Sequence, residues 1–171
     1  GLTPLDGLPM GTRSGALDAG ILEYLMDLKG FDIHQMLNVL NKKSGVLGVS
    51  GVSSDFRDLD EAAAKGNARA KLAVDMFTYK VSERIGSAAA AMGGIDGVIF
   101  TAGVGKNSAS LRAEILEGME FMGICLDPEK NKTRGKEAII STDSSPVKVM
   151  VIPTNEELVI AMDTAALVSG K

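Results

Sequence analysis

The stretch GIDGVIFTAGVGKN, residues 94–107, decides the fold, because an apolar strand runs directly into a glycine turn that opens a helix. Val98–Phe100 is a short, uninterrupted apolar run, which is typical of a strand buried on both faces. Gly103 and Gly105 permit positive φ angles and leave no Cβ in the way of a ligand. The layout therefore predicts a strand, a turn and a helix that together suit a bound nucleotide.

The sequence of this turn alone leaves two interpretations open. Asn107 or Ser108 can cap the next helix, so that free N–H groups and the positive end of the helix dipole face the turn and attract a phosphate. Many strand-to-helix turns, however, need glycine for their geometry only. The turn also matches neither a P-loop nor the dinucleotide fingerprint, since Gly105-Lys106 is followed by asparagine and no G-x-G-x-x-G occurs.

Three further segments accompany this turn in a recognisable order. The four together are GTRSG at 11–15, SSDFRD at 53–58, FTAGVGKNS at 100–108 and IPTNEE at 152–157. In this order and spacing they resemble the C-terminal part of the acetate and propionate kinase family, and the match runs from Gly1 to about Val168. The resemblance implies an α/β fold of the actin-like ATPase type, with ribonuclease-H-like topology, of which this chain is the C-terminal portion.

The resemblance also indicates what precedes this portion in the family. The first strands of the domain's sheet, the phosphate-gripping segment and the catalytic Asp and His all come before the position of Gly1. We therefore expect residues 1–171 to form a single C-terminal nucleotide-binding domain, a fragment of a longer kinase, with a sheet that lacks its first strands. The parent enzyme would transfer the γ-phosphoryl of ATP to acetate reversibly, forming acetyl phosphate with Mg²⁺. The alternatives are an inactive nucleotide-binding and dimerisation module, or propionate kinase as the parent.

Composition argues against several other classes. The 171 residues, 45% of them hydrophobic, are enough for one buried core. The net charge is -4 without a basic cluster, so a nucleic-acid partner is not expected. No apolar run reaches the roughly 18 residues of a membrane span, and no signal-peptide pattern opens the chain. Cys125 reads as a small buried hydrophobe in a short strand, and a single cysteine fits a cytoplasmic protein. A homodimer is implied by the resemblance.

Helical patterns alternate with short apolar strands, which indicates an α/β layered fold. Asp18 is expected to begin a helix that Gly30 ends. Asp32 and Gln35 predict a capping box at the start of the next helix. The remaining expected elements are a flexible connector at 45–51, a short helix from Asp58, a long core-facing helix to Met92, and strands at 97–101, 121–126, 137–140 and 148–152.

Arg13 lies in a loop of small residues that would leave its guanidinium exposed but positioned. An arginine presents a planar fork of donors that matches carboxylate or phosphoryl oxygens, and its charge does not titrate away. The resemblance implies that Arg13 stabilises the phosphoryl group during its transfer, so we expect it to be catalytic. Without the resemblance, a surface arginine in a turn would be the simpler interpretation.

Two loops are expected to hold ATP or ADP. Asp55, Phe56 and Arg57 combine an acceptor, an aromatic ring and a cation, which can hold a purine by hydrogen bonding and stacking. The alternative is that they are solvated residues beside a helix cap at Asp58. The resemblance places adenine and ribose contacts there and on the turn, where Lys106 departs from the family's usual acid. The turn residues concerned are Gly103, Val104, Gly105, Lys106 and Asn107.

Two adjacent glutamates follow the last predicted strand. If Thr154 is the N-cap, Glu157 falls at N3 and completes a capping box, so its carboxylate has a structural role. Glu156 has no such role, and the resemblance implies that it contributes to a Mg²⁺ site together with phosphates and waters. Otherwise Glu156 is a favourable acid in the first turn of a helix.

Overall fold

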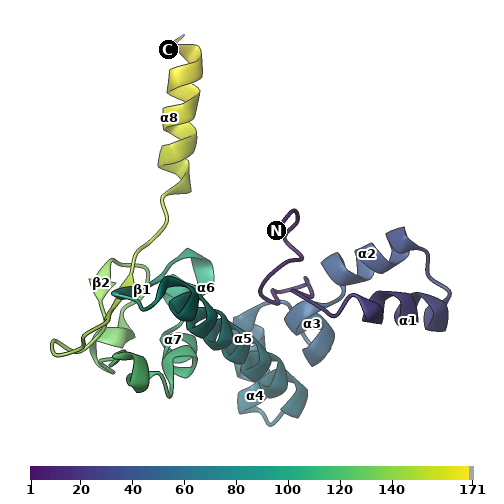
Figure 1. The fold of residues 1–171 in the computed structure, drawn as a ribbon, viewed down its shortest axis with the longest axis horizontal. Helices are drawn as coiled ribbons and strands as arrows, with labels where there is room; N and C mark the ends of the chain where they lie inside the picture. Colours follow the sequence, from purple (N-terminus) through teal and green to yellow (C-terminus); the bar gives the residue numbers. More distant parts are fainter. Residues whose placement is uncertain (170–171) are drawn as a thin grey trace. The chain divides into compact units, whose positions relative to one another are not determined.

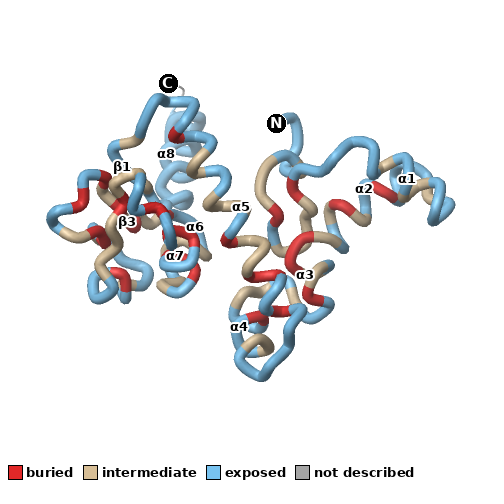
Figure 2. Tube along the Cα trace, turned by 60° about the horizontal axis from the view of Figure 1, so that its bottom comes forward, coloured by how far each residue is buried: buried red, intermediate tan, exposed pale blue. Residues whose placement is uncertain are grey.

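The computed structural model describes residues 1–169 and divides into two compact units, Gly1–Ala88 and Ala89–Lys171 (Figure 1). Each unit contains buried residues of its own, drawn in red in Figure 2. The first unit is helical, and the second is built on a sheet. The two groups of predicted site residues are therefore divided between the units, with Arg13 and Asp55–Arg57 in the first and Gly103–Asn107 and Glu156 in the second.

A small set of apolar side chains is buried in the first unit, and α1 contributes none of them. The helices of this unit are α1 (Gly20–Lys29), α2 (Ile33–Lys42), α3 (Gly45–Ser50), α4 (Phe56–Ala64) and α5 (Ala68–Met92), of which the last continues into the second unit. Buried apolar residues of this unit are Met36, Leu40, Val46, Leu59, Ala70, Ala73 and Val74. The long helix to Met92 is confirmed, although Met92 itself, predicted to face the core, is exposed.

Local capping chemistry sets the ends of α1 and α2. α1 begins at Gly20, whose N–H donates to Asp18 Oδ1 at 2.9 Å, and Gly30 ends it in the left-handed conformation with φ 64°. The capping box is confirmed, because the Gln35 N–H donates to Asp32 Oδ1 at 2.8 Å and the Asp32 N–H donates to Gln35 Oε1 at 2.9 Å. These contacts satisfy backbone donors that the first turn of a helix cannot satisfy internally.

The segment 45–51 forms α3, so the prediction of a flexible connector is wrong. Gly45 has a φ of 60°, and a Cβ at this position would clash with Met10 O and lie 2.7 Å from Arg13 O. The glycine is therefore needed for close approach of two backbone segments rather than for flexibility. This approach fixes the loop that carries Arg13.

α4 begins before the predicted position, and Asp55 rather than Asp58 is its N-cap. The Asp55 carboxylate accepts the Arg57 N–H at 2.9 Å, which is the contact expected of an N-cap side chain. Asp58 instead accepts a hydrogen bond from Ser53 Oγ at 2.7 Å. The helix that begins here places Arg57 in its first turn, beside the cap.

The second unit contains a mixed sheet in the order β1-β3-β2. Its strands are β1 (Gly97–Phe100), β2 (Ala138–Ile139) and β3 (Lys148–Val151). β1 and β3 are parallel, with Phe100 opposite Val151, and β2 is antiparallel to β3. The predicted strands at 97–101, 137–140 and 148–152 are confirmed, as is the α/β layout.

β1 is buried on one face only. Phe100 is 7% exposed, whereas Ile99 is 54% exposed. Successive side chains of a strand point to opposite faces, and within the described residues β1 pairs with β3 alone. The prediction of a strand buried on both faces is therefore wrong for Ile99.

The other elements of the second unit are α6 (Ala102–Asn107), α7 (Ala109–Leu116), α8 (Glu156–Val168) and two 3₁₀ turns, η1 (Glu120–Met122) and η2 (Lys130–Lys132). The strand predicted at 121–126 is wrong, because this stretch holds η1 followed by isolated bridges at Ile124 and Leu126. Gly123, with φ 83°, turns the chain there and prevents a continuous ladder. Cys125 is half-buried in this irregular segment rather than in a strand.

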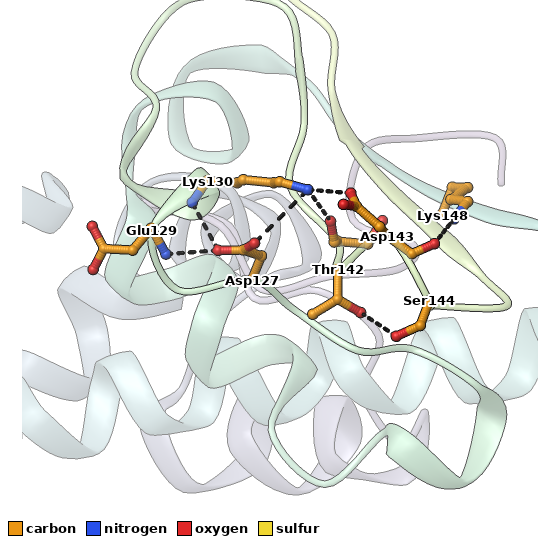
Figure 3. A network of polar contacts seen from close by, with 8 residues as sticks. Asp127, Glu129, Lys130, Thr142, Asp143, Ser144 and Lys148 are labelled. Carbon is orange, nitrogen blue, oxygen red and sulfur yellow. Dashed lines mark hydrogen bonds and ion pairs between the residues drawn. The ribbon is translucent and has the colours of Figure 1, made fainter.

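A polar network fixes the charged connection around η2 (Figure 3). Lys130 Nζ lies 2.5 Å from Asp143 Oδ1 and 3.8 Å from Asp127 Oδ2. Asp127 Oδ1 also accepts the backbone N–H groups of Glu129 and Lys130 at 2.9 and 3.0 Å. The hydrogen bond from Lys130 lowers the pKa of Asp143. The network holds in place the turn that carries Asn131.

Candidate functional site

The carboxyl ends of β1 and β3 bring two of the predicted site segments to one edge of the sheet. The Ile152 N–H donates to Phe100 O at 2.9 Å, and the hydroxyl groups of Thr101 and Thr154 are in contact. In open α/β sheets, ligands bind outside the carboxyl ends of the parallel strands. The α6 turn and the start of α8 thus leave the sheet at the edge where a ligand is expected.

The predicted glycine turn is the short helix α6, and its one left-handed residue is not a glycine. Ala102 has a φ of 56°, whereas Gly103 and Gly105 do not have positive φ angles, so that part of the prediction is wrong. A Cβ on Gly105 would lie 3.4 Å from Phe100, while a Cβ on Gly103 would meet nothing within 4 Å. A non-glycine residue in the left-handed region is strained, and such strain gathers at ligand-binding segments.

Arg112, which the sequence reasoning missed, holds the far end of α6. This residue of α7 is fully buried, and its Nη1 donates to Gly105 O at 2.8 Å. Its Nε donates to Asn131 Oδ1 at 2.8 Å, and Nη2 donates to Asn131 O at 2.6 Å and Thr133 O at 2.9 Å. Burial lowers the pKa of the Arg112 guanidinium. An arginine between Leu111 and Ala113 reads as a solvated charge, and only the surrounding apolar positions of α7 could have signalled its burial.

Ser108 is the N-cap of α7, which decides between the two predicted caps, Asn107 and Ser108. Its Oγ accepts the Leu111 N–H at 3.3 Å, and Leu111, Ile115 and Leu116 are buried. Asn107 is the last residue of α6 and is exposed. α7 therefore packs its apolar face inward while its first turn follows directly on the candidate nucleotide segment.

The start of α8 differs from the prediction by one residue. Asn155 is the N-cap, and its Oδ1 accepts the Leu158 N–H at 3.0 Å. The capping box of Thr154 and Glu157 is therefore wrong, because Asn155 occupies the N-cap position and the Thr154 hydroxyl contacts Thr101 instead. Glu156 and Glu157 are both exposed acids of the first turn. Glu157 therefore has no capping role, and this reason for favouring Glu156 over Glu157 as a metal ligand does not hold.

The donor set near Glu156 is sparse for a metal held by protein alone. Within residues 1–169, no group of three or more His, Cys, Asp or Glu could hold a metal ion. Magnesium, however, is often bound by one or two carboxylates together with nucleotide phosphates and water. One exposed carboxylate at the edge of the sheet fits that kind of site.

In the first unit, the loop that carries Arg13 is held by its backbone. Thr12 O accepts the Ser44 N–H, and Arg13 O accepts the Met10 N–H at 3.0 Å. The Ser14 N–H donates to Leu40 O at 2.9 Å. These bonds fix the loop without using the Arg13 side chain.

The Arg13 guanidinium is correspondingly available. Its Nη1 lies 3.6 Å from Met10 Sδ, and no carboxylate of residues 1–169 forms an ion pair with it. The residue is half-buried. A fixed backbone with a guanidinium that forms no ion pair within the described residues is the arrangement expected of a group that binds an anion.

Asp55 and Arg57 form a bidentate pair. Arg57 Nε and Nη2 donate to the two Asp55 carboxylate oxygens at 3.1 and 2.6 Å. The side-chain hydrogen bond from Arg57, together with the Arg57 backbone N–H, lowers the pKa of Asp55 to about 2. The Phe56 ring packs against Phe77, with ring centroids 4.6 Å apart and planes at 58°. The pair leaves the Arg57 plane held at one edge and exposed to solvent.

The two predicted segments of the first unit are adjacent. A Cβ on Gly11 would lie 3.0 Å from Ser54 O, so the Arg13 loop runs directly against the residue before Asp55. The structure therefore joins Arg13 to Asp55–Arg57 within one unit, and the α6 turn to the start of α8 within the other.

Comparisons with known proteins identify the family and the fold. The model of the Acetokinase family matches residues 1–162. The acetate kinase of Caldanaerobacter subterraneus subsp. tengcongensis is 59% identical over 171 residues, which are 99% of this chain and 43% of that protein. The crystal structure of Porphyromonas gingivalis acetate kinase superposes with a TM-score of 0.93 at 49% identity, covering 98% of this chain and 42% of that one.

A propionate kinase from Francisella tularensis subsp. tularensis SCHU S4 has the same fold, with a TM-score of 0.86 at 42% identity over 94% of this chain and 41% of that one. The chain thus spans less than half the length of the relatives it matches. Among the helices of residues 1–169, none combines the length and apolar character that crossing a bilayer requires. The likeness to solved acetate kinases confirms the expected C-terminal portion of an actin-like ATPase fold, and the chain belongs to the acetokinase family.

Proposed function

We propose that the protein supplies the nucleotide-binding part of an acetate kinase, which transfers the γ-phosphoryl of ATP to acetate reversibly and forms acetyl phosphate. The observation that carries the proposal is the α6 turn, which leaves β1 at the carboxyl edge of the parallel pair with a strained first residue, Ala102. The family match over residues 1–162 supports it. We also propose that residues 1–171 act as a single nucleotide-binding domain of the longer kinase.

The α6 turn would contact the nucleotide through its backbone. Gly103 leaves open space beside the chain, so a ligand can approach the main chain closely. Val104, Gly105 and Lys106 are half-buried and Asn107 is exposed. Since backbone contacts carry this binding, the lysine at position 106 is compatible with it and adds a positive charge.

The Asp55–Arg57 segment would contribute stacking and hydrogen bonding. The bidentate pair fixes the orientation of the Arg57 plane, which is then available to stack on a purine. The contact of Phe56 with Phe77 fixes the segment to α5. Asp55 keeps its charge at neutral pH because its pKa is about 2.

Arg13 would stabilise the phosphoryl group during its transfer. Phosphoryl transfer depends mainly on positioning and charge neutralisation, and a well-placed arginine contributes on the order of 10³ to 10⁵ in rate. This role is supported by the fixed backbone of the 10–14 loop and by a guanidinium whose one side-chain contact among the described residues is the weak one with Met10 Sδ. Glu156 would hold Mg²⁺ together with phosphate oxygens, and the ion would neutralise charge on those oxygens.

A homodimer and a cytoplasmic location complete the proposal. Exposed apolar side chains gather on α1 and α2, where Tyr24, Leu28, Ile33 and Leu37 are exposed. Exposed apolar patches mark interaction surfaces, so the exposed faces of α1 and α2 are suited to contact a second copy. The same observation favours the second candidate function, a nucleotide-binding and dimerisation module without activity. Propionate remains the alternative acyl substrate.

Titration of the purified 171-residue chain with ADP tests the nucleotide site. We expect amide chemical-shift changes at 103–107 and at 55–57, and weaker binding in Asp55→Asn. Asp75→Asn is the matched control, since Asp75 is half-buried and pairs with Lys71 on α5. Shift changes that gather elsewhere, for instance around His34, would contradict the assignment.

An activity assay separates the two candidate functions. The chain alone is expected to form no acetyl phosphate, because the segments that the family resemblance assigns to phosphate gripping and acid–base chemistry lie outside it. Supplying those segments from a longer relative should restore acetyl phosphate formation, and Arg13→Ala should abolish it again. Acetyl phosphate formation by the chain alone, free of host kinase, would contradict this division of roles.

A further inference from the structure

Arg112 makes four hydrogen bonds, all to neutral oxygens. Its guanidinium donates to Gly105 O of α6, to the carboxamide and main-chain oxygens of Asn131, and to Thr133 O, at 2.6 to 2.9 Å. The last two residues belong to the 131–135 loop. Among the described residues, no carboxylate pairs with it. A buried charge without a counter-ion is expensive, so an apolar residue would serve a purely packing role at lower cost.

Asn131 extends the same connection. It is buried, and besides accepting from Arg112 it donates from Nδ2 to Ala109 O at 2.8 Å. A few residues further on, the Gly135 N–H donates to Lys106 O at 2.9 Å. The last carbonyls of α6 are thus bound by Arg112 and by the 131–135 loop. Cationic donors suit the carbonyl end of a helix.

α6 is therefore fixed at both ends. At its start, Ala102 is in the left-handed region and Thr101 contacts Thr154 across the sheet edge. At its end, Gly105 O is held by a planar fork that can satisfy several acceptors at once. A strained start persists only where the surrounding contacts determine the conformation, and Arg112 supplies the contacts on the other side.

We propose that Arg112 is a positioning residue for nucleotide binding, whose guanidinium fixes the end of α6 against the 131–135 loop and so shapes the backbone of Gly103–Asn107 for the nucleotide. The inference rests on the proposed binding of ADP or ATP at α6. Arg112 would thus affect nucleotide binding without touching the nucleotide. The 131–135 loop would have the same role, because it binds Arg112 and the last carbonyls of α6.

The test compares Arg112→Lys with Ile115→Val. Lysine keeps the charge but lacks the fork that reaches Gly105, Asn131 and Thr133 together. Ile115→Val reduces the packing of the same helix, and Ile115 is not a hydrogen-bond partner of Arg112. ADP binding is measured by calorimetry alongside thermal melts. Arg112→Lys should raise the Kd for ADP on the order of tenfold. Ile115→Val should lower the melting temperature and leave the Kd unchanged.

The outcomes separate positioning from simple stability. An unchanged Kd in Arg112→Lys overturns the inference even if its melting temperature falls. An equal rise of Kd in both variants also overturns it, because affinity then follows stability. If the unmutated protein binds no ADP, the proposed function fails together with this inference. If binding is weakened by Asp55→Asn but not by Arg112→Lys, this inference alone fails.

A second variant and a measurement without mutation cover the case in which Arg112→Lys does not fold. Asn131→Ala keeps the arginine and removes one of its acceptors, and a several-fold higher Kd is expected. In the unmutated protein, saturating ADP should slow hydrogen exchange of the Gly135 amide, which donates to Lys106 O. An exchange rate that ADP does not change overturns the inference.

Discussion

The loop that carries Arg13 and the short helix α6 are both candidate ligand segments, yet they are held in different ways. The 10–14 loop is fixed by main-chain hydrogen bonds and by the close approach of Gly45, so its arginine side chain stays available. α6 is held at its end by the buried guanidinium of Arg112, together with the hydrogen bond from the Gly135 N–H to Lys106 O. A loop held by its backbone can offer side chains for chemistry, whereas a short helix held through a buried side chain offers mainly its backbone and depends strongly on that residue.

Truncation of the two arginines gives the largest expected difference. Arg112→Ala should lower the free energy of unfolding by about 3–5 kcal/mol, because buried oxygens lose their donor. Arg13→Ala should change it by no more than about 0.5 kcal/mol, since its side chain supports no fold contact apart from Met10. Urea unfolding of both variants measures the contrast. Equal losses in the two variants would remove the basis of the comparison.

Gly45→Ala tests whether backbone approach holds the Arg13 loop. An alanine there would combine left-handed strain with a clash between its Cβ and Met10 O, so we expect a loss of about 3 kcal/mol in unfolding free energy. Gly66→Ala is the matched control, because Gly66 has φ 88° and a Cβ there would meet nothing within 4 Å. It should lose about 1 kcal/mol from strain alone. Similar losses would show that the approach of the two segments is unimportant.

The start of α8 is an intermediate case, a helix held by one cap side chain. Asn155→Ala should lower stability by about 1 kcal/mol, because Oδ1 no longer accepts the Leu158 N–H. Glu157→Ala should change stability by no more than about 0.5 kcal/mol, through the helix dipole alone. Thermal melts followed by far-ultraviolet circular dichroism check both. A larger loss in Glu157→Ala would restore the capping box that the sequence suggested.

The smallest expected effect is the titration of Asp55. Its pKa is lowered from 3.8 to about 2, mainly by the side-chain hydrogen bond from Arg57. The contribution of the pair to stability is therefore present above the unfolded pKa and is lost as the pH falls through about 2. Carbon-detected NMR of the Asp55 carboxyl should show its pKa rising toward 3.8 in Arg57→Gln. Arg69→Gln, a change elsewhere in the same unit, should leave the pKa of Asp55 unchanged.

Local chemistry made part of this structure predictable. The Asp32–Gln35 box, the left-handed Gly30 and the apolar runs of β1 and β3 depend on neighbours in the sequence, and all are confirmed. The four segments likewise identified the family, because their order and spacing are more specific than any one motif alone.

The remaining features depend on distant contacts. Arg112 could not be read as buried because its acceptors lie up to 21 residues away in the chain. Gly45 could not be read as a packing glycine without Met10 opposite it. At α8, Thr154 and Asn155 are both good caps, and the contact of Thr154 with Thr101 across the sheet accompanies the choice of Asn155. The proposed catalytic and binding roles themselves stay predictions.

Because the hydrogen-bond partners of Arg112 are neutral, its contacts should depend little on the salt concentration. Dissolved ions screen exposed charges over about 10 Å at 0.1 M salt, so pairs such as Asp55–Arg57 weaken as salt is added. A buried guanidinium bound to carbonyl and carboxamide oxygens interacts with dipoles at contact distance, where ions have no access. Concentrated salt would therefore weaken the exposed ion pairs of the protein and leave the hydrogen bonds between Arg112 and its neighbours intact. The affinity for a nucleotide bound mainly through the α6 backbone would fall less at high salt than the affinity for one held by exposed charges.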